Sequence, residues 1–191
     1  MSKPVVYVFL GLIASGKSTL AEMFSQSRKL PYHNTDRVRK ELAGMEATER
    51  GTAGAGQGIY TTAFTEKTYG ALLERAAKDL QNGADGVVLD GSYSKRSDRA
   101  KVIRLADQLQ AEAVFIVCSC SDREVKRRLA VRAQDPNAVS DGNWEIFVRQ
   151  KEKFEFPDEI SGQQLIELDT ESPPDHLLQE LALKLSDRKS G

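Results

Sequence analysis

The stretch that decides the fold is VVYVFLGLIASGKS, residues 5–18. Residues 11–18 match the pattern G-x-x-x-x-G-K-[ST], and the apolar run before them is typical of a buried strand. Leu20, Met23 and Phe24 follow at the spacing of three and four that indicates an amphipathic helix. A glycine-rich loop between a strand and a helix predicts a phosphate-binding site for a nucleoside triphosphate.

The residue types of this loop suit phosphate chemistry. Glycines let backbone N–H groups surround the β-phosphate, Lys17 reaches the β- and γ-phosphates, and the Ser18 hydroxyl ligates Mg²⁺ at a helix N-terminus. We therefore predict that the loop binds a nucleotide together with Mg²⁺. The predicted nucleotide-binding residues are Gly11, Ala14, Ser15, Gly16, Lys17, Ser18 and Thr19.

Length and composition favour one soluble domain. The chain has 191 residues, and 40% of them are hydrophobic, which is enough for a core; we expect a single domain over 1–186 and a disordered tail over 187–191. Lysine plus arginine (27) nearly cancels aspartate plus glutamate (28), so the net charge of −1 gives no general attraction to nucleic acid or membrane. Cys118 and Cys120 are too close for an ordinary disulfide, and no apolar segment is long enough to span a membrane. We expect a cytoplasmic protein.

Apolar runs alternate with amphipathic segments along the chain. The further predicted strands are 30–33, 87–89, 113–117 and 165–168. The predicted helices are 17–28, one from near Asp36, 61–82, 95–110, 122–133 and 174–185. Ser121-Asp122 and Ser140-Asp141 are typical of helix starts. This alternation predicts an α/β fold with a parallel sheet covered by helices on both faces, and ligands at the carboxyl ends of the strands.

A carboxylate follows the second predicted strand. Asp36 lies in the sequence TDRVRK, residues 35–40, where it or Thr35 is a good helix cap. Alternatively, a carboxylate beside the phosphate loop orients or deprotonates the hydroxyl group that attacks the γ-phosphate. Arg39 shares its side of the helix and is a candidate to hold an anionic or polyol group, whereas Arg37 and Lys40 are expected to face solvent.

Asp90 ends the third predicted strand in the manner of a Walker B element. It is a candidate to hold a water bound to Mg²⁺ or to steady Asp36, and its simpler interpretation is a turn residue at a strand end. Gly91 follows where ATPases that perform mechanical work place a glutamate, and the guanine-reading element Asn-Lys-x-Asp is absent from the sequence. Both observations favour phosphoryl transfer to an acceptor over a motor or GTPase function.

A basic helix precedes a short polar break. Arg128 and Arg132 lie four residues apart on one side of the helix predicted at 122–133. Such arginines suit a helical lid, here at about 127–141, that closes over the triphosphate and spreads the charge of the transition state. The glycine-rich stretch 51–58 lacks a preceding strand; we interpret it as a flexible connector, with closure over substrate as the alternative.

Four motifs together resemble those of the small P-loop kinases of the polynucleotide kinase and gluconate kinase type. These motifs are the phosphate loop, Thr35-Asp36-x-x-Arg39-Lys40, Val88-Leu89-Asp90 and Arg128-Leu129-x-x-Arg132. The likeness covers most of residues 4–157 and is greatest to the ATP-binding domain that is fused behind aminoglycoside-phosphotransferase-like domains. It implies a three-layer α/β/α P-loop NTPase fold, with a five-stranded parallel sheet of order 2-3-1-4-5 and a small helical lid.

The resemblance also implies roles for individual residues. ATP lies on the phosphate loop, and adenine lies near residues 169–172. The aspartate that matches Asp36 activates the acceptor hydroxyl, and the arginine that matches Arg39 binds the acceptor phosphate in the nucleic-acid enzymes. A lid arginine, matching Arg128 or Arg132, contacts the phosphates of ATP. The catalytic residues predicted from the sequence are thus Lys17, Asp36, Arg39, Arg128 and Arg132, with Ser18 and Asp90 predicted for Mg²⁺.

Three functions fit these observations. The leading one is an ATP-dependent kinase for a hydroxyl group of a small molecule. The second is a kinase for the 5′-hydroxyl of DNA or RNA, which the near-zero net charge and the lack of an aromatic and basic stripe disfavour. The third is a regulatory module that binds or hydrolyses ATP without an acceptor.

Overall fold

Five parallel strands form one sheet in the computed structural model, which describes residues 3–46, 58–135 and 143–188. The strands are β1 (Val5–Leu10), β2 (Tyr32–Asn34), β3 (Gly86–Asp90), β4 (Glu112–Ser119) and β5 (Leu165–Asp169). Their order across the sheet is β2-β3-β1-β4-β5, which confirms the predicted topology. The second strand begins two residues later than predicted, and the Pro31 carbonyl, just before it, accepts the Val88 N–H at 2.8 Å.

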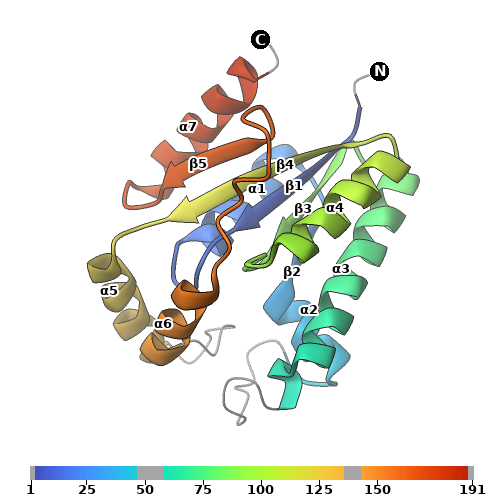
Figure 1. The fold of residues 1–191 in the computed structure, drawn as a ribbon. Coiled ribbons are helices and arrows are strands. Elements are labelled where there is room, and N and C mark those ends of the chain that lie inside the picture. The colour runs from blue at the N-terminus through green and yellow to red at the C-terminus, as the bar shows by residue number, and fades with distance from the viewer. Residues whose placement is uncertain (1–2, 47–57, 136–142, 189–191) are drawn as a thin grey trace.

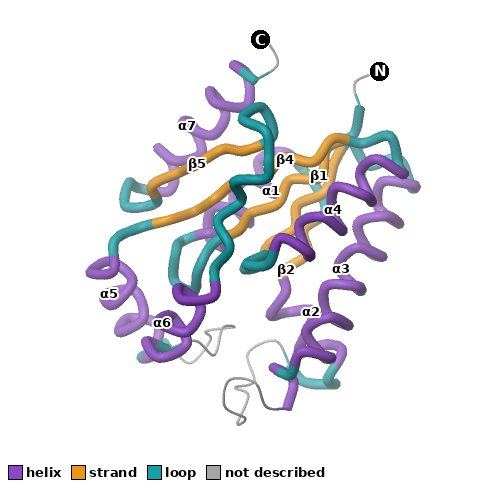
Figure 2. Tube along the Cα trace, viewed as in Figure 1, coloured by secondary structure: helices purple, strands orange, loops and turns teal. Residues whose placement is uncertain are grey.

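Helices cover both faces of this sheet. They are α1 (Lys17–Arg28), α2 (Thr35–Leu42), α3 (Thr62–Gln81), α4 (Arg96–Gln108), α5 (Asp122–Ala133), α6 (Trp144–Lys153) and α7 (Pro174–Asp187), with a 3₁₀ turn at Gly58–Tyr60. Figure 2 shows α1 and α7 on one side of the strands and α3 and α4 on the other. The predicted three-layer architecture is therefore present.

Alternation of side chains along β1 explains the two core layers. Val6 and Val8 pack among the buried residues of α3 and α4, whereas Val5 and Phe9 pack against those of α1 and α7. Successive residues of a strand point to opposite faces, so a run of apolar residues buries both sides of a central strand. This arrangement fixes β1, and hence the loop that follows it, in the middle of the molecule.

The carboxyl ends of the strands face the side on which α2, α5 and α6 lie (Figure 1). Helix α6 begins after Asn143, whose side chain accepts the Ile146 N–H at 3.0 Å; the helix start predicted at 140–141 lies outside the described residues. The glycine stretch is described only at Gly58, and the lid only up to residue 135. Within the described ranges, no helix is long and apolar enough to cross a membrane.

The C-terminal helix is longer than predicted. Helix α7 runs to Asp187, and the following residue, Arg188, donates a hydrogen bond to Glu112 at 2.9 Å. The prediction of a disordered tail from 187 onward is therefore wrong for its first two residues. The side chain of Glu112, the first residue of β4, thus holds the end of α7 in place although it is distant in sequence.

Candidate active site

The phosphate loop connects β1 to α1. Its backbone takes left-handed conformations at Ala14 (φ 58°) and Gly16 (φ 82°), and α1 then begins at Lys17 without a side-chain cap. A helix start without a cap leaves backbone N–H groups available to an anion. The Lys17 ammonium donates to the Leu12 carbonyl at 3.2 Å, on the same loop. Ser18 is half-buried at the start of this helix.

Three side chains from other elements hold the loop. Gln150 of α6 accepts the Ile13 N–H at 2.9 Å, Arg128 of α5 donates to the Ala14 carbonyl at 3.2 Å, and Thr170, just beyond β5, donates to the Ser15 carbonyl at 2.6 Å. Sequence reasoning did not identify Gln150, and it placed Thr170 only within the stretch 169–172 that the resemblance puts near adenine. Neither belongs to a motif, and their contacts bridge more than 130 positions of the chain.

Asp90 lies at the end of β3, directly beside β1. It is fully buried, and one carboxylate oxygen, Oδ2, accepts from the Tyr32 hydroxyl at 2.7 Å and from the Asn34 amide at 2.6 Å. The other oxygen, Oδ1, is buried and has no partner among the described residues. Burial and the neighbouring Asp90 carboxylate raise the pKa of Tyr32, so its hydroxyl stays a donor. Asp90 is therefore more than a turn residue.

The cap of α2 is Asn34. Its side-chain oxygen accepts the N–H groups of Asp36 and Arg37, both at 3.0 Å. The interpretation of Asp36 or Thr35 as the cap is therefore wrong, and the carboxylate of Asp36 accepts no hydrogen bond from the residues that the structure describes. The Asp36 carboxylate therefore does not serve as a helix cap.

Electrostatics connect Asp36 to the phosphate loop. Burial raises the pKa of the Asp36 carboxyl, while Lys17 and Arg39 act to lower it. Strand β3 lies between β1 and β2, so the phosphate loop after β1 and Asp36 in the first turn of α2 follow the two strands that flank β3. A half-buried carboxylate whose pKa responds to the lysine of a phosphate loop is a candidate to act on an incoming group.

Arg39 holds part of the fold through one end of its guanidinium, while its buried Nε atom has no hydrogen-bond partner among the described residues. Its Nη1 atom donates to the Ile59 carbonyl at 2.9 Å and to the Thr65 hydroxyl at 3.0 Å, and its guanidinium lies over the Tyr60 ring, 5.1 Å from the centroid. These contacts tie α2 to the start of α3. Lys40, which we expected to face solvent, is fully buried, so that expectation is wrong.

The two arginines of α5 differ in their surroundings. Arg128 donates to Glu124 at 2.8 Å, to the Ala14 carbonyl and to both the hydroxyl and the carbonyl of Thr170. The guanidinium of Arg132 donates no hydrogen bond to the described residues, although its backbone carbonyl accepts the Asp135 N–H at 3.1 Å. Burial lowers its pKa, and Asp36 acts in the opposite direction, so Arg132 lies within the electrostatic reach of that carboxylate. Hydrogen bonds therefore tie Arg128 to the phosphate loop, whereas the charge of Arg132 interacts with that of Asp36.

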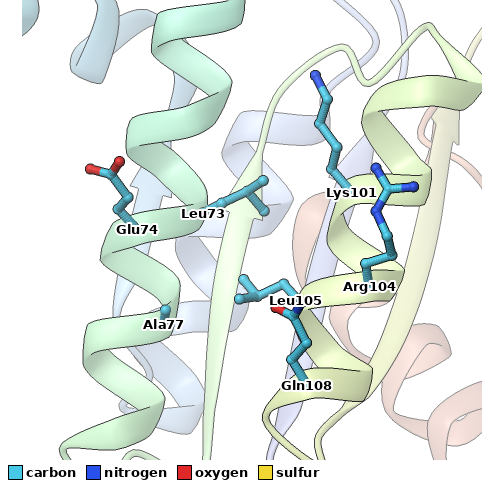
Figure 3. A pocket seen from close by; sticks show the side chains of 7 residues that line it. All are labelled: Leu73, Glu74, Ala77, Lys101, Arg104, Leu105 and Gln108. Carbon is cyan, nitrogen blue, oxygen red and sulfur yellow. The ribbon is translucent and has the colours of Figure 1, made fainter.

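A groove of about 290 Å³ lies elsewhere, between α3 and α4. Figure 3 shows Leu73 and Leu105 between the two helices, with Glu74 on one helix and Lys101 and Arg104 on the other. It contains none of the residues predicted for nucleotide, metal or acceptor. The chemistry is thus expected at the strand ends.

The described residues contain no group of three or more histidine, cysteine, aspartate or glutamate side chains suited to a metal ion. Cys118 is buried and Cys120 half-buried, and both are free thiols. A metal at this site would therefore be held by few protein ligands, with phosphate oxygens and water completing its shell, as Mg²⁺ commonly is.

Strand, glycine-rich loop and helix, with a parallel sheet of order 2-3-1-4-5, define a P-loop nucleotide-binding protein. The family model described as "AAA domain" matches residues 6–157, and the chain belongs to this family. A comparison with curated proteins gives no match.

Solved structures share the fold at low sequence identity. A gluconokinase from Sinorhizobium meliloti 1021 is 20% identical, with a TM-score of 0.65 over 97% of this chain and 93% of its own. A shikimate kinase from Aquifex aeolicus is 14% identical, with a TM-score of 0.61 over 98% and 99%. An APS kinase from Mycobacterium tuberculosis, solved with AMPPNP and APS, is 17% identical, with a TM-score of 0.63 over 97% and 99%.

Proposed function

We propose that the protein is an ATP-dependent kinase that transfers the γ-phosphoryl group to a hydroxyl of a small molecule. The observation that carries this proposal is the carboxylate of Asp36. It is half-buried, free of protein hydrogen-bond donors among the described residues, relieved of capping by Asn34, and within the electrostatic reach of Lys17 and Arg132. Positioning and charge neutralisation are what phosphoryl transfer requires of a protein.

The proposed reaction proceeds in line. The acceptor hydroxyl gives its proton to the Asp36 carboxylate as its oxygen forms a bond to the γ-phosphorus. The bond from that phosphorus to the β,γ-bridging oxygen breaks, and ADP leaves. Lys17 and the N–H groups at the start of α1 hold the β- and γ-phosphates during the transfer.

The residues present fit Mg²⁺. Asp90 offers a buried oxygen without a partner among the described residues, and Ser18 offers a hydroxyl at the start of α1. These are the hard oxygen ligands that Mg²⁺ prefers. When bound, the ion neutralises charge on the phosphates. Tyr32 and Asn34 hold the Asp90 carboxylate through its other oxygen, which leaves Oδ1 for a water or the ion.

Of the two lid arginines, we assign the phosphate-facing role to Arg132. The guanidinium of Arg128 donates to protein acceptors, whereas the guanidinium of Arg132 donates no hydrogen bond to the described part of the chain. A guanidinium without such partners can follow the charge as it develops on the transferred group. We further propose that a lid at about 127–141 closes over the nucleotide.

A small, uncharged polyol acceptor suits the site better than a polynucleotide. In the nucleic-acid enzymes, the arginine matching Arg39 binds a phosphate, but here its Nη1 already serves Ile59 and Thr65. The net charge of −1 also offers little attraction to a polyanion. We also propose that the protein is most similar to the ATP-binding domain fused with aminoglycoside-phosphotransferase-like domains. Its proposed location is the cytoplasm.

A screen of acceptors tests the proposal. Wild-type protein with ATP and Mg²⁺ is offered sugars, aminoglycosides, nucleosides and oligonucleotides with 5′-hydroxyl ends, and ADP release is measured above the hydrolysis rate without acceptor. We expect a small hydroxyl compound to raise the rate and Asp36→Asn to abolish the increase while nucleotide binding persists. An increase in ADP release with oligonucleotides alone would favour the polynucleotide kinase. Steady hydrolysis that no acceptor raises and Asp36→Asn leaves unchanged would favour a regulatory module.

A further inference from the structure

Thr170 joins three loops at the carboxyl edge of the sheet. The residue is 2% exposed and lies directly after β5. Its hydroxyl lies 2.6 Å from the Ser15 carbonyl and 3.0 Å from the Ser119 carbonyl, at the end of β4. A hydroxyl has one proton to donate, and the shorter contact identifies the Ser15 carbonyl as its main acceptor.

Arg128 completes the arrangement from the lid helix. Its Nη1 donates to the Thr170 hydroxyl and to the Ala14 carbonyl, both at 3.2 Å, and Nη2 donates to the Thr170 carbonyl. Glu124 holds the Nε side of the same guanidinium at 2.8 Å. The guanidinium is therefore fixed between the phosphate loop and the residue that follows β5.

These contacts lie against the outer surface of the loop. A Cβ atom at Gly16 would lie 2.8 Å from Nη1 of Arg128 and 3.1 Å from the Thr170 side chain. Gly16 also has a φ of +82°, a conformation that favours glycine. Because Gly16 has no side chain, Arg128 and Thr170 can lie against the loop at this position.

The orientation of the peptide groups follows from these carbonyl contacts. In a planar trans peptide, the carbonyl of one residue and the N–H of the next point in opposite directions. With the Ser15 carbonyl held by Thr170, the Gly16 N–H points away from Thr170, and no described residue accepts it. The Ala14 carbonyl accepts from Arg128, and the Ser15 N–H of the same peptide group donates to the Leu12 carbonyl at 3.2 Å within the loop.

We propose that Thr170 and Arg128 are positioning residues that aim the backbone N–H of Gly16 at the β-phosphate of the bound nucleotide. The inference rests on the proposed function in that it requires a nucleotide on the phosphate loop. It assigns Arg128 a task different from the direct contact with ATP phosphates that the sequence suggested. It also gives Thr170, a residue outside every motif, a part in nucleotide affinity.

Matched substitutions of Thr170 test the proposal. Thr170→Val keeps the shape of the side chain and removes the hydroxyl, whereas Thr170→Ser keeps the hydroxyl. Titration calorimetry of the full chain with ADP and with AMPPNP, both with Mg²⁺, gives the dissociation constants. We expect Thr170→Val to weaken both nucleotides equally, by about tenfold, because one misaligned hydrogen bond to a charged group costs about that much. Thr170→Ser should bind like the wild type.

Arg128→Gln provides a second route should Thr170→Val unfold. It should also weaken ADP and AMPPNP to the same extent, and combining it with Thr170→Val should add little, since both act on one contact network. Arg127→Gln is the control, because Arg127 shares Glu124 with Arg128 but is 65% exposed and contacts no residue of the phosphate loop. Thermal unfolding of each variant verifies that it is folded at the temperature of titration.

The outcomes separate this inference from the proposed function. Unchanged ADP affinity in folded Thr170→Val or in folded Arg128→Gln would overturn the inference and leave the proposed function standing. A loss in Arg128→Gln confined to AMPPNP would overturn it in favour of a direct contact to the γ-phosphate. Failure of the wild type to bind either nucleotide would overturn the proposed function and the inference with it.

Discussion

Asn34→Ala is expected to destabilise the protein more than the loss of an ordinary helix cap. The side chain caps α2 through the N–H groups of Asp36 and Arg37 and also donates to the buried Asp90 carboxylate at 2.6 Å. Losing a cap costs about 1 kcal/mol, and removing a donor from a buried carboxylate costs about 1–3 kcal/mol. The free energy of unfolding should therefore fall by about 2–4 kcal/mol.

The matched control is Asn143→Ala. Asn143 caps α6 by accepting the Ile146 N–H at 3.0 Å, but it is exposed and makes no contact with a buried carboxylate. Its loss should cost only about 1 kcal/mol. Urea unfolding followed by circular dichroism measures both variants, with equal slopes required for the comparison. If Asn34→Ala costs no more than Asn143→Ala, the argument that Asn34 couples Asp90 to α2 is wrong.

Asn34→Asp separates the two tasks of this residue. A carboxylate there still caps α2, because aspartate is as good a cap as asparagine. It cannot donate to Asp90, however, and two carboxylates at this separation repel each other and raise the pKa of the pair. We therefore expect the variant to lose stability as the pH rises through that raised pKa and to regain it on acidification. A variant whose stability is independent of pH relative to the wild type would contradict this account.

Three further predictions concern the site and the fold. Asp36→Asn should keep ADP binding and lower acceptor phosphorylation by on the order of 10²–10⁴-fold. Because burial raises the pKa of Asp36, wild-type activity should fall on the acid side at a pH above the ordinary value of about 3.9, and an inflection at or below that value would contradict the assignment. Arg132→Met should slow transfer by on the order of 10³-fold with ADP affinity unchanged, and single-turnover rates equal to the wild type would exclude its role. Glu159→Gln should cost about 1.5–3 kcal/mol in urea unfolding at pH 7, because Arg99 is fully buried and donates to both oxygens of Glu159. The hydrogen bonds from Arg99 lower the pKa of Glu159, so this stability is present above the unfolded value of about 4.3 and disappears as the pH falls through the lower folded value; a deficit that persists unchanged at low pH would refute it.

Local sequence patterns predicted the fold because each pattern acts over a few residues. Residues 5–24 determine strand, loop and helix together, since a continuous apolar run, glycine at positive φ and helical spacing all depend on near neighbours. The same holds for α5, whose predicted range 122–133 equals the observed Asp122–Ala133. Its N-cap, Ser121, was also predicted, because capping connects residues three positions apart.

The candidate site was predictable only in part. The sequence located a carboxylate after β2 but offered Asp36 and Thr35 as caps, although Asn34 occupies that position. It assigned Lys40 to solvent, because a lysine on a short polar helix is usually exposed, yet α2 packs on α3 and buries it. A helix face cannot be ranked as inner or outer until the elements packed against it are known.

The sequence by itself therefore determined that this protein has a phosphate loop at the carboxyl end of a strand in a parallel sheet, with Asp36, Asp90 and two arginines near the strand ends. Only the tertiary structure distinguished Arg128 from Arg132. The partners of Arg128 lie 114 and 42 positions away, at Ala14 and Thr170, and no local pattern links residues at such separations. Hydrogen-bond partners are selected by how the strands and helices pack, and that packing occupies the guanidinium of Arg128 but, among the described residues, not that of Arg132.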